Sequence, residues 1–196
     1  MKFVAIDFET ANYCAAGICA AGVATFEDGA LTESKYWLIR PPKGSGWFRD
    51  ELIAVHGITH EMVRSCPEFP EIAPEFFARL AAADIVVAHS AHFDVPKLRS
   101  TVKHFGLECP QFDYTCTYRL SKIIWPQLEN HQLPTVASHI GHKFEHHNAL
   151  ADAEAAGRIL LAMMQEKNTA GLRALAELLG VQPVAVRINN DPSCGK

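Results

Sequence analysis

The chain has 196 residues, of which 48% are apolar and 20% charged, and its formal net charge is −4. This length and composition are those of one globular domain with a sizeable buried core. The acidic balance excludes a protein that holds long duplex nucleic acid mainly through a basic surface, because that mode needs many Lys and Arg side chains opposite phosphates. A nucleic-acid site built on bound cations stays open, because cations reverse the local sign of charge.

The cysteines and the N-terminus indicate the compartment. The six cysteines form no C-x-x-C pair, and a chain of this size does not need disulfides to fold. We therefore expect free thiols in a reducing environment. Asp7 interrupts the first apolar run too early for a signal peptide, and no segment of ~20 residues is free of charge. The sequence thus predicts a soluble, cytoplasmic protein that does not enter a membrane.

The first part of the sequence predicts an antiparallel meander. Residues 3–8, 18–26 and 31–39 are apolar runs of strand length. Residues 27–30, with the sequence EDGA, form a hairpin turn between the second and third runs, in which glycine supplies a positive φ. The first run is interrupted only by Asp7, which suits a strand buried on both faces that presents an acid at its carboxyl end.

The remainder of the chain alternates between strands and helices. Two more strands are expected, at residues 85–88 and 112–116. Turn signals mark short segments at 51–55 and 61–64. Helical spacing predicts helices at 72–83, 95–105, 118–125, 133–140, 149–164 and 172–179. This order predicts an α/β fold, a mixed five-stranded sheet with helices packed on its faces. We place one domain at residues 1–180 and a C-terminal tail at 181–196, of which Asn189–Lys196 is polar and frayed.

Asp7 and Glu9 are the first candidate functional pair. They stand two residues apart on an extended strand, so their side chains point to the same face. Two like charges at one strand end repel unless a cation binds between them. A D-x-E triplet is also common by chance, so a solvated strand end remains the alternative.

Asp94 follows the second buried strand, at residues 85–88, and begins a helix. A carboxylate there can simply cap the backbone N–H groups of the helix. His89, His92 and Phe93 crowd the same strand-to-helix loop, at the edge of the sheet where open α/β folds place their sites. This crowding favours a functional role for Asp94 over a plain cap.

His147 and Asp152 are five residues apart, which on one helix would separate them by roughly 140°. Asn148 resolves the conflict, because it is a good N-cap and lets the helix begin at Ala149. Asp152 then lies on the first turn, and His147 lies in the preceding loop, free to face the same site. His146 competes for that role only if the helix begins one residue earlier.

Phosphodiester hydrolysis needs what these residues can supply together. Two divalent cations ~3.5 to 4 Å apart require a cluster of carboxylates, and a histidine can accept a proton near neutral pH. Our hypothesis makes Asp7, Glu9, Asp94 and Asp152 the ligands of two Mg²⁺ or Mn²⁺ ions and His147 the general base. Eight histidines between His89 and His147 raise the possibility of zinc, but none is spaced with cysteines as in a tetrahedral site, and carboxylates favour harder ions.

In this order and on these elements, the motifs resemble those of the DEDDh exonucleases, the group of the DnaQ-like polymerase III epsilon proofreading domain, ribonuclease T and oligoribonuclease. The resemblance covers residues 3–164. Supporting motifs in the order of the chain are FET at 8–10, VHGIT at 55–59, AHSAHFD at 88–94, CT at 116–117, LPTVA at 133–137 and HNALADA at 147–153. Each motif is ordinary alone, but the whole series is specific.

The resemblance implies a ribonuclease H-like fold and a 3′-to-5′ exonuclease that acts on single-stranded ends, with DNA favoured and RNA possible. It implies the ligand and base roles above and adds Thr10 as a contact to the terminal nucleotide. Phe93 could stack on a base, although a core role explains it equally well. His56 flanks a turn that relatives place near the site mouth, and a structural role is the stronger alternative for it. Ser90 departs from the family's usual Asn.

Two other classes of function compete. One is a non-catalytic nucleic-acid-binding or polymerase-associated module of the same fold, against which an intact set of four acids and one histidine argues, because such a module has no need of repelling carboxylates. The other is a phosphohydrolase of small nucleotides, which would need a closed pocket. The role in proofreading, repair or RNA trimming, any polymerase or repair partner and the oligomeric state stay open.

Overall fold

In the computed structural model, which describes residues 1–181 and 184–186, the strands form one mixed sheet with the order β3-β2-β1-β4-β5-β6. The pairs β1–β2, β2–β3 and β5–β6 are antiparallel, and β4 is parallel to both β1 and β5. The strands are β1 (Lys2–Thr10), β2 (Ile18–Glu27), β3 (Ala30–Leu38), β4 (Ile85–Ala88), β5 (Phe112–Cys116) and β6 (Val184–Val186). The helices are α1 (Asp50–His56), α2 (His60–Val63), α3 (Phe69–Ala81), α4 (Ala91–Phe105), α5 (Thr117–Ile124), α6 (Leu133–His139), α7 (Ala149–Glu166) and α8 (Leu172–Leu179).

All five predicted strands are present, and the sheet gains a sixth short strand. Within the segment predicted as a tail from residue 181, Val184–Val186 form this strand and pair with β5. The polar segment Asn189–Lys196 lies outside the described residues. One correction concerns α4, which begins at Ala91 with Ser90 as its N-cap residue. Asp94 is therefore inside the first turn of α4 and is not the N-cap.

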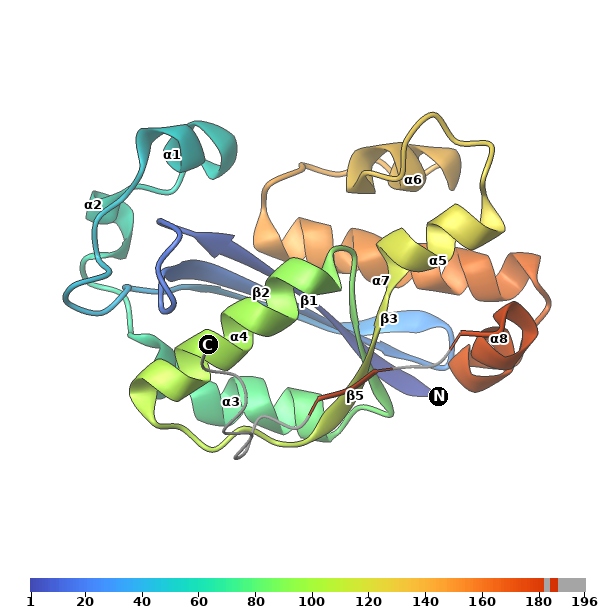
Figure 1. The fold of residues 1–196 in the computed structure, drawn as a ribbon, viewed down its shortest axis with the longest axis horizontal. Coiled ribbons are helices and arrows are strands. Elements are labelled where there is room, and N and C mark those ends of the chain that lie inside the picture. Colours follow the sequence, from blue (N-terminus) through green and yellow to red (C-terminus); the bar gives the residue numbers. More distant parts are fainter. Residues whose placement is uncertain (182–183, 187–196) are drawn as a thin grey trace.

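Helices cover both faces of the sheet, and the alternation of side chains along β1 decides what each face meets. Val4, Ile6 and Phe8 pack in the core cluster that contains the apolar residues of α3 and α4. Phe3 and Ala5 pack in the cluster that contains α5, α6, α7 and α8. Figure 1 shows α3 and α4 on one side of β1 and α5, α6 and α7 on the other. Residues 7 and 9 continue the odd-numbered series of β1, so their side chains belong to the α7 face.

Two glycines let α7 approach the sheet closely. Gly22 lies opposite Asp7 in the β1–β2 pairing, and a Cβ at Gly22 would lie 2.1 Å from the carbonyl oxygen of Ala149. Gly157, within α7, leaves no room for a Cβ beside the ring of Phe26, 2.1 Å away. The first turn of α7 therefore rests directly on the sheet next to Asp7.

We expect Gly22→Ala to lower the free energy of unfolding by about 1–3 kcal/mol, because overpacking a close contact forces the backbone to move. Urea unfolding followed by circular dichroism measures the loss. Gly46→Ala is the matched control, since the nearest atoms to its added Cβ lie 3.6 Å away. Equal stability of the two variants would show that α7 does not depend on the contact at Gly22.

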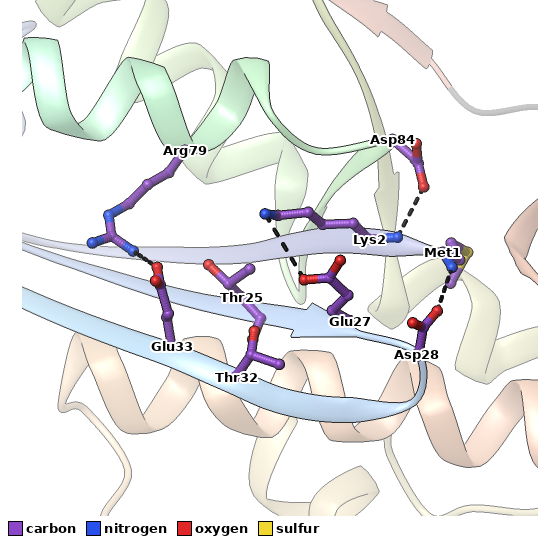
Figure 2. Close-up of polar contacts among 9 residues, drawn as sticks. All are labelled: Met1, Lys2, Thr25, Glu27, Asp28, Thr32, Glu33, Arg79 and Asp84. Atoms are coloured by element: carbon purple, nitrogen blue, oxygen red, sulfur yellow. Dashed lines mark hydrogen bonds and ion pairs between the residues drawn. The ribbon is translucent and has the colours of Figure 1, made fainter.

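The amino end of β1 is held by polar contacts far from the carboxyl end of the strand (Figure 2). The backbone N–H of Lys2 donates to Asp84 at 2.8 Å, and the N-terminal ammonium group of Met1 pairs with Asp28 at 3.0 Å. Arg79 of α3 pairs with Glu33 of β3 at 2.8 Å. These contacts lie at the surface, where each stabilises the fold only weakly, and they help to fix the ends of the meander.

Two expectations about the whole chain can be compared with the described residues. Cys14, Cys19, Cys66, Cys109 and Cys116 are free thiols, as predicted. Among residues 1–181 and 184–186, no helix has the length and apolar character needed to cross a membrane.

Candidate active site

Three of the four predicted carboxylates meet at the carboxyl end of β1. Asp7 and Glu9 reach this point from β1, and Asp152 reaches it from the first turn of α7. One carboxylate oxygen from each of the three lies within 4.8 Å of the others. The strand alternation places Asp7 and Glu9 on the α7 face, and the close contact at Gly22 brings α7, which carries Asp152, against them.

The local sequence fixes where α7 begins, as predicted. The Asn148 side chain accepts hydrogen bonds from the N–H groups of Leu150 and Ala151, both at 3.2 Å. This cap satisfies two of the free N–H groups at the start of the helix. The backbone N–H of His147, in the preceding loop, donates to Asp152 at 3.2 Å. The loop that leads into α7 therefore fixes the position of the Asp152 carboxylate.

Asp94 is a fourth carboxylate, and its charge acts on Asp7 and Glu9. It lies on the first turn of α4, directly after β4, which runs parallel to β1. Its side chain is 1% exposed, and its Oδ1 atom has no hydrogen-bond partner among the described residues. A buried carboxylate oxygen without a partner is costly unless a cation binds it.

The electrostatics of the cluster show uncompensated negative charge. Burial raises the pKa of Asp7 well above its usual value, and the charges of Asp94, Asp152 and Glu9 raise it further. Burial, followed by the charges of Asp152 and Asp94, raises the pKa of Glu9 to about 8. Burial also raises the pKa of Asp94 to about 8, although backbone N–H groups oppose the change. The four groups cannot all ionise together without a counter-charge.

Divalent cations fit this donor set. The available ligands are carboxylate oxygens from three elements, which are the ligands that Mg²⁺ and Mn²⁺ prefer. The partnerless Oδ1 of Asp94 and the raised carboxylate pKa values are both relieved by positive charge in the site. We therefore regard Asp7, Glu9, Asp94 and Asp152 as the residues that would hold the ions.

The two adjacent histidines take different positions in the loop before α7. The His146 Nδ1 atom lies 3.0 and 3.1 Å from the two oxygens of Asp152. His147 has a positive φ of 68°, and its ring stacks on His146 with centroids 3.7 Å apart. Burial lowers the pKa of His147, and the His146 and His56 rings lower it further. The imidazole of His147 is thus neutral near pH 7 and able to accept a proton.

The predicted substrate contacts are arranged around the cluster. Thr10, buried at the end of β1, has its carbonyl 3.2 Å from Nε2 of His56. Nδ1 of His56 accepts from the N–H of Ile58 at 3.0 Å, so both ring nitrogens are engaged within the chain. Phe93 is 42% exposed and is available for stacking, whereas Phe8 packs in the core against Phe76.

His89, which the sequence placed near the site, has both ring nitrogens engaged in contacts within the chain. Its Nδ1 lies 3.0 Å from the Thr117 hydroxyl, and its Nε2 lies 2.8 Å from the carbonyl of His131. Burial lowers the pKa of His89 to about 4, so the ring stays neutral. Through these two contacts, His89 joins the end of β4 to the loop before α6.

The contact of His146 with Asp152 was not predicted from the sequence, because the path of the loop carries no signal in the residue pattern.

Comparison with known proteins identifies the family. The family model RNase_T, described as "Exonuclease", matches residues 4–160. The chain is 32% identical over 171 residues to the 3′-5′ exonuclease DinG of Bacillus subtilis, covering 84% of this chain and 18% of that protein. It is 27% identical over 183 residues to a DNA polymerase III PolC-type protein of Caldanaerobacter subterraneus subsp. tengcongensis, covering 92% and 13%. The chain thus spans less than a fifth of these two relatives.

Solved structures share the fold. Exonuclease X in complex with 5′ overhanging duplex DNA superposes with a TM-score of 0.72 and 22% identity, covering 91% of this chain and 99% of that one. The nuclease domain of 3′hExo, a DEDDh family member bound to rAMP, gives a TM-score of 0.72 and 17% identity, covering 84% and 92%. These similarities confirm the expected ribonuclease H-like fold. The family match over residues 4–160 shows that the chain belongs to the RNase_T family of DnaQ-like exonucleases, and the shared fold agrees with this.

Proposed function

We propose that the protein is a metal-dependent 3′-to-5′ exonuclease that hydrolyses the last phosphodiester bond of a single-stranded end and releases nucleoside 5′-monophosphates. The observation that carries the proposal is the cluster of Asp7, Glu9 and Asp152 on β1 and α7. The buried Asp94 of α4 interacts with this cluster electrostatically and has an oxygen without a hydrogen-bond partner among the described residues. A module without catalytic function has no physical need for such repulsion at one sheet edge.

The residues of the chain have distinct tasks in this proposal. Asp7, Glu9, Asp94 and Asp152 would hold two Mg²⁺ or Mn²⁺ ions, and such ions would supply activation of water and stabilisation of negative charge on the reacting oxygens. His147 accepts the proton of the attacking water, because its lowered pKa keeps the ring neutral. Thr10, at the end of β1, positions the terminal nucleotide, and Phe93 stacks on a base.

DNA is the favoured substrate, and RNA is the alternative. Relatives that align with nine tenths of this chain include DNA polymerase III PolC-type proteins, and Exonuclease X is solved with DNA. The 3′hExo nuclease domain, in contrast, is solved with rAMP, and discrimination against a 2′-hydroxyl rests on one or two contacts. By analogy with the polymerase III relatives, a polymerase or repair complex is the proposed partner.

Hydrolysis of labelled oligonucleotides tests the proposed function. We expect single-stranded DNA carrying a 5′ label to shorten one nucleotide at a time with Mg²⁺ or Mn²⁺, and to stay intact with EDTA. The matching RNA strand, assayed in parallel, shows which sugar is preferred. If neither strand is cut with either ion, the non-catalytic binding module becomes the better account.

A further inference from the structure

A second group of metal-binding side chains adjoins the carboxylate cluster and differs from it in chemistry. His146, His147 and Asp152 each offer one ligand atom, and these atoms lie within 4.8 Å of one another. Two of the three ligands are imidazole nitrogens, whereas the cluster described above offers only oxygens. The loop before α7 and the first turn of that helix supply all three residues.

We propose that His146, His147 and Asp152 form an inhibitory site for an imidazole-preferring ion of the Zn²⁺ class. Imidazole suits zinc, copper and nickel, and carboxylates with water suit magnesium and manganese. Three protein ligands with an open fourth position are a common zinc arrangement. The side chain of His146 is 33% exposed, which leaves a path for the ion and for a water ligand.

The distances are close to those that such an ion needs. Zinc bonds of ~2.0 to 2.1 Å to nitrogen or oxygen place neighbouring tetrahedral ligands about 3.3 Å apart. The His146 Nδ1 atom already lies 3.0 Å from an Asp152 oxygen. The ligand atoms of all three residues lie within 4.8 Å of one another, and binding would require the His147 ring to rotate out of its stack on His146 so that its nitrogen points at the ion. Any proton shared by His146 and Asp152 leaves to solvent when the ion binds.

Two features of the loop hold the ligands in this arrangement. The ring of Phe144 lies 5.8 Å from that of His146 in an edge-on contact. The positive φ of His147 places two consecutive side chains on the same side of the loop, which an extended backbone would not do. The sequence showed no zinc spacing because the loop geometry, and not a residue interval, brings His146 to Asp152.

The expected consequence of zinc binding rests on the proposed function. An ion held by these three residues would take a carboxylate away from the catalytic cluster and occupy the nitrogen of His147 that accepts a proton. Zn²⁺ would therefore inhibit an enzyme that Mg²⁺ activates, and His146, which has no task in the proposed reaction, would determine the sensitivity.

Zinc binding can be measured without any nuclease assay. In isothermal titration of the metal-free protein with Zn²⁺, we expect His146→Ala to weaken the affinity by at least about tenfold, because one of three protein ligands is lost. His142→Ala, in the same loop but outside the group, is the matched control. Co²⁺ bound to the unaltered protein should give the intense visible bands of tetrahedral coordination. Equal Zn²⁺ affinity of His146→Ala and the unaltered protein, or octahedral Co²⁺ bands, would overturn the site.

Inhibition is tested on oligonucleotide hydrolysis with Mg²⁺, with each variant compared with its own zinc-free rate. We expect Zn²⁺ to inhibit the unaltered protein and His142→Ala at concentrations at least about tenfold below those needed for His146→Ala. Equal inhibition of all three would refute the inhibitory role. If none of the three cuts nucleic acid, the proposed function fails, and the titration still decides whether the zinc site exists.

Discussion

Asp7→Asn is expected to lower kcat by at least about 10³-fold, the largest effect of any single substitution in this chain. The metal ions of such a site supply several kcal/mol of transition-state stabilisation, and each 1.36 kcal/mol corresponds to a tenfold change in rate. Asp7 is central because its carboxyl interacts with those of Asp94, Asp152 and Glu9. Hydrolysis of labelled single-stranded DNA with saturating Mn²⁺ measures the change. Asp152→Asn should behave in the same way.

The same substitution is expected to stabilise the metal-free protein. Burial and three neighbouring carboxylates raise the pKa of Asp7. When the pKa of a carboxyl group is higher in the folded state than in the unfolded state, the group destabilises the folded state at pH values above the unfolded-state pKa. This penalty disappears at low pH, where the group is protonated in both states. Asp7→Asn should therefore increase the urea midpoint at about pH 8 in EDTA and have no effect at about pH 3.

Asp113→Asn is the matched control for both measurements, because Asp113 is exposed on β5. It should retain full activity and an unchanged urea midpoint. A folded Asp7→Asn protein with the activity of this control would exclude Asp7 as a metal ligand. A loss of activity accompanied by a lower midpoint would instead point to damage to the fold.

The sequence predicts those parts of the site that depend on residues close together in the chain. The side-chain alternation of β1 puts Asp7 and Glu9 on one face, and the Asn148 cap fixes the start of α7. Both are local rules, and both predictions agree with the structure. Most of the fold was likewise predictable, because apolar runs and turn residues mark strands β1 to β5 within a few positions.

The features that the pattern could not show depend on contacts between distant segments. The close approach of Gly22 to Ala149 carries no signal in either segment alone, although it brings α7 to the sheet. The strand β6 has three residues, which is too short for a periodic pattern, and its partner β5 lies far away in the sequence. Ser90 makes no side-chain cap hydrogen bond, so the residues before α4 gave no reason to begin the helix at Ala91.

His147→Ala is expected to slow hydrolysis by roughly 10²- to 10⁴-fold, the usual range for loss of a general base. His147→Asn is a useful second variant, since Asn tolerates the positive φ that His147 adopts. Both should keep the metal affinity of the unaltered protein for Mn²⁺, because the four carboxylates remain. Hydrolysis rates measured at saturating Mn²⁺ separate the proton-transfer defect from weaker metal binding.

The pH profile distinguishes a base from a residue that only shapes the loop. Burial lowers the pKa of His147 below its usual 6.5, so the rate of the unaltered protein should rise with pH below that value and be level near pH 7. The rate of His147→Ala should not level off near pH 7. Added imidazole should restore part of that rate by accepting the proton in place of the side chain. His142→Ala removes another partly buried imidazole of lowered pKa from the same loop and should keep the original profile. If His147→Ala kept that profile as well, the proton would have to be accepted elsewhere, and His146, 3.0 Å from Asp152, would be the nearest alternative base.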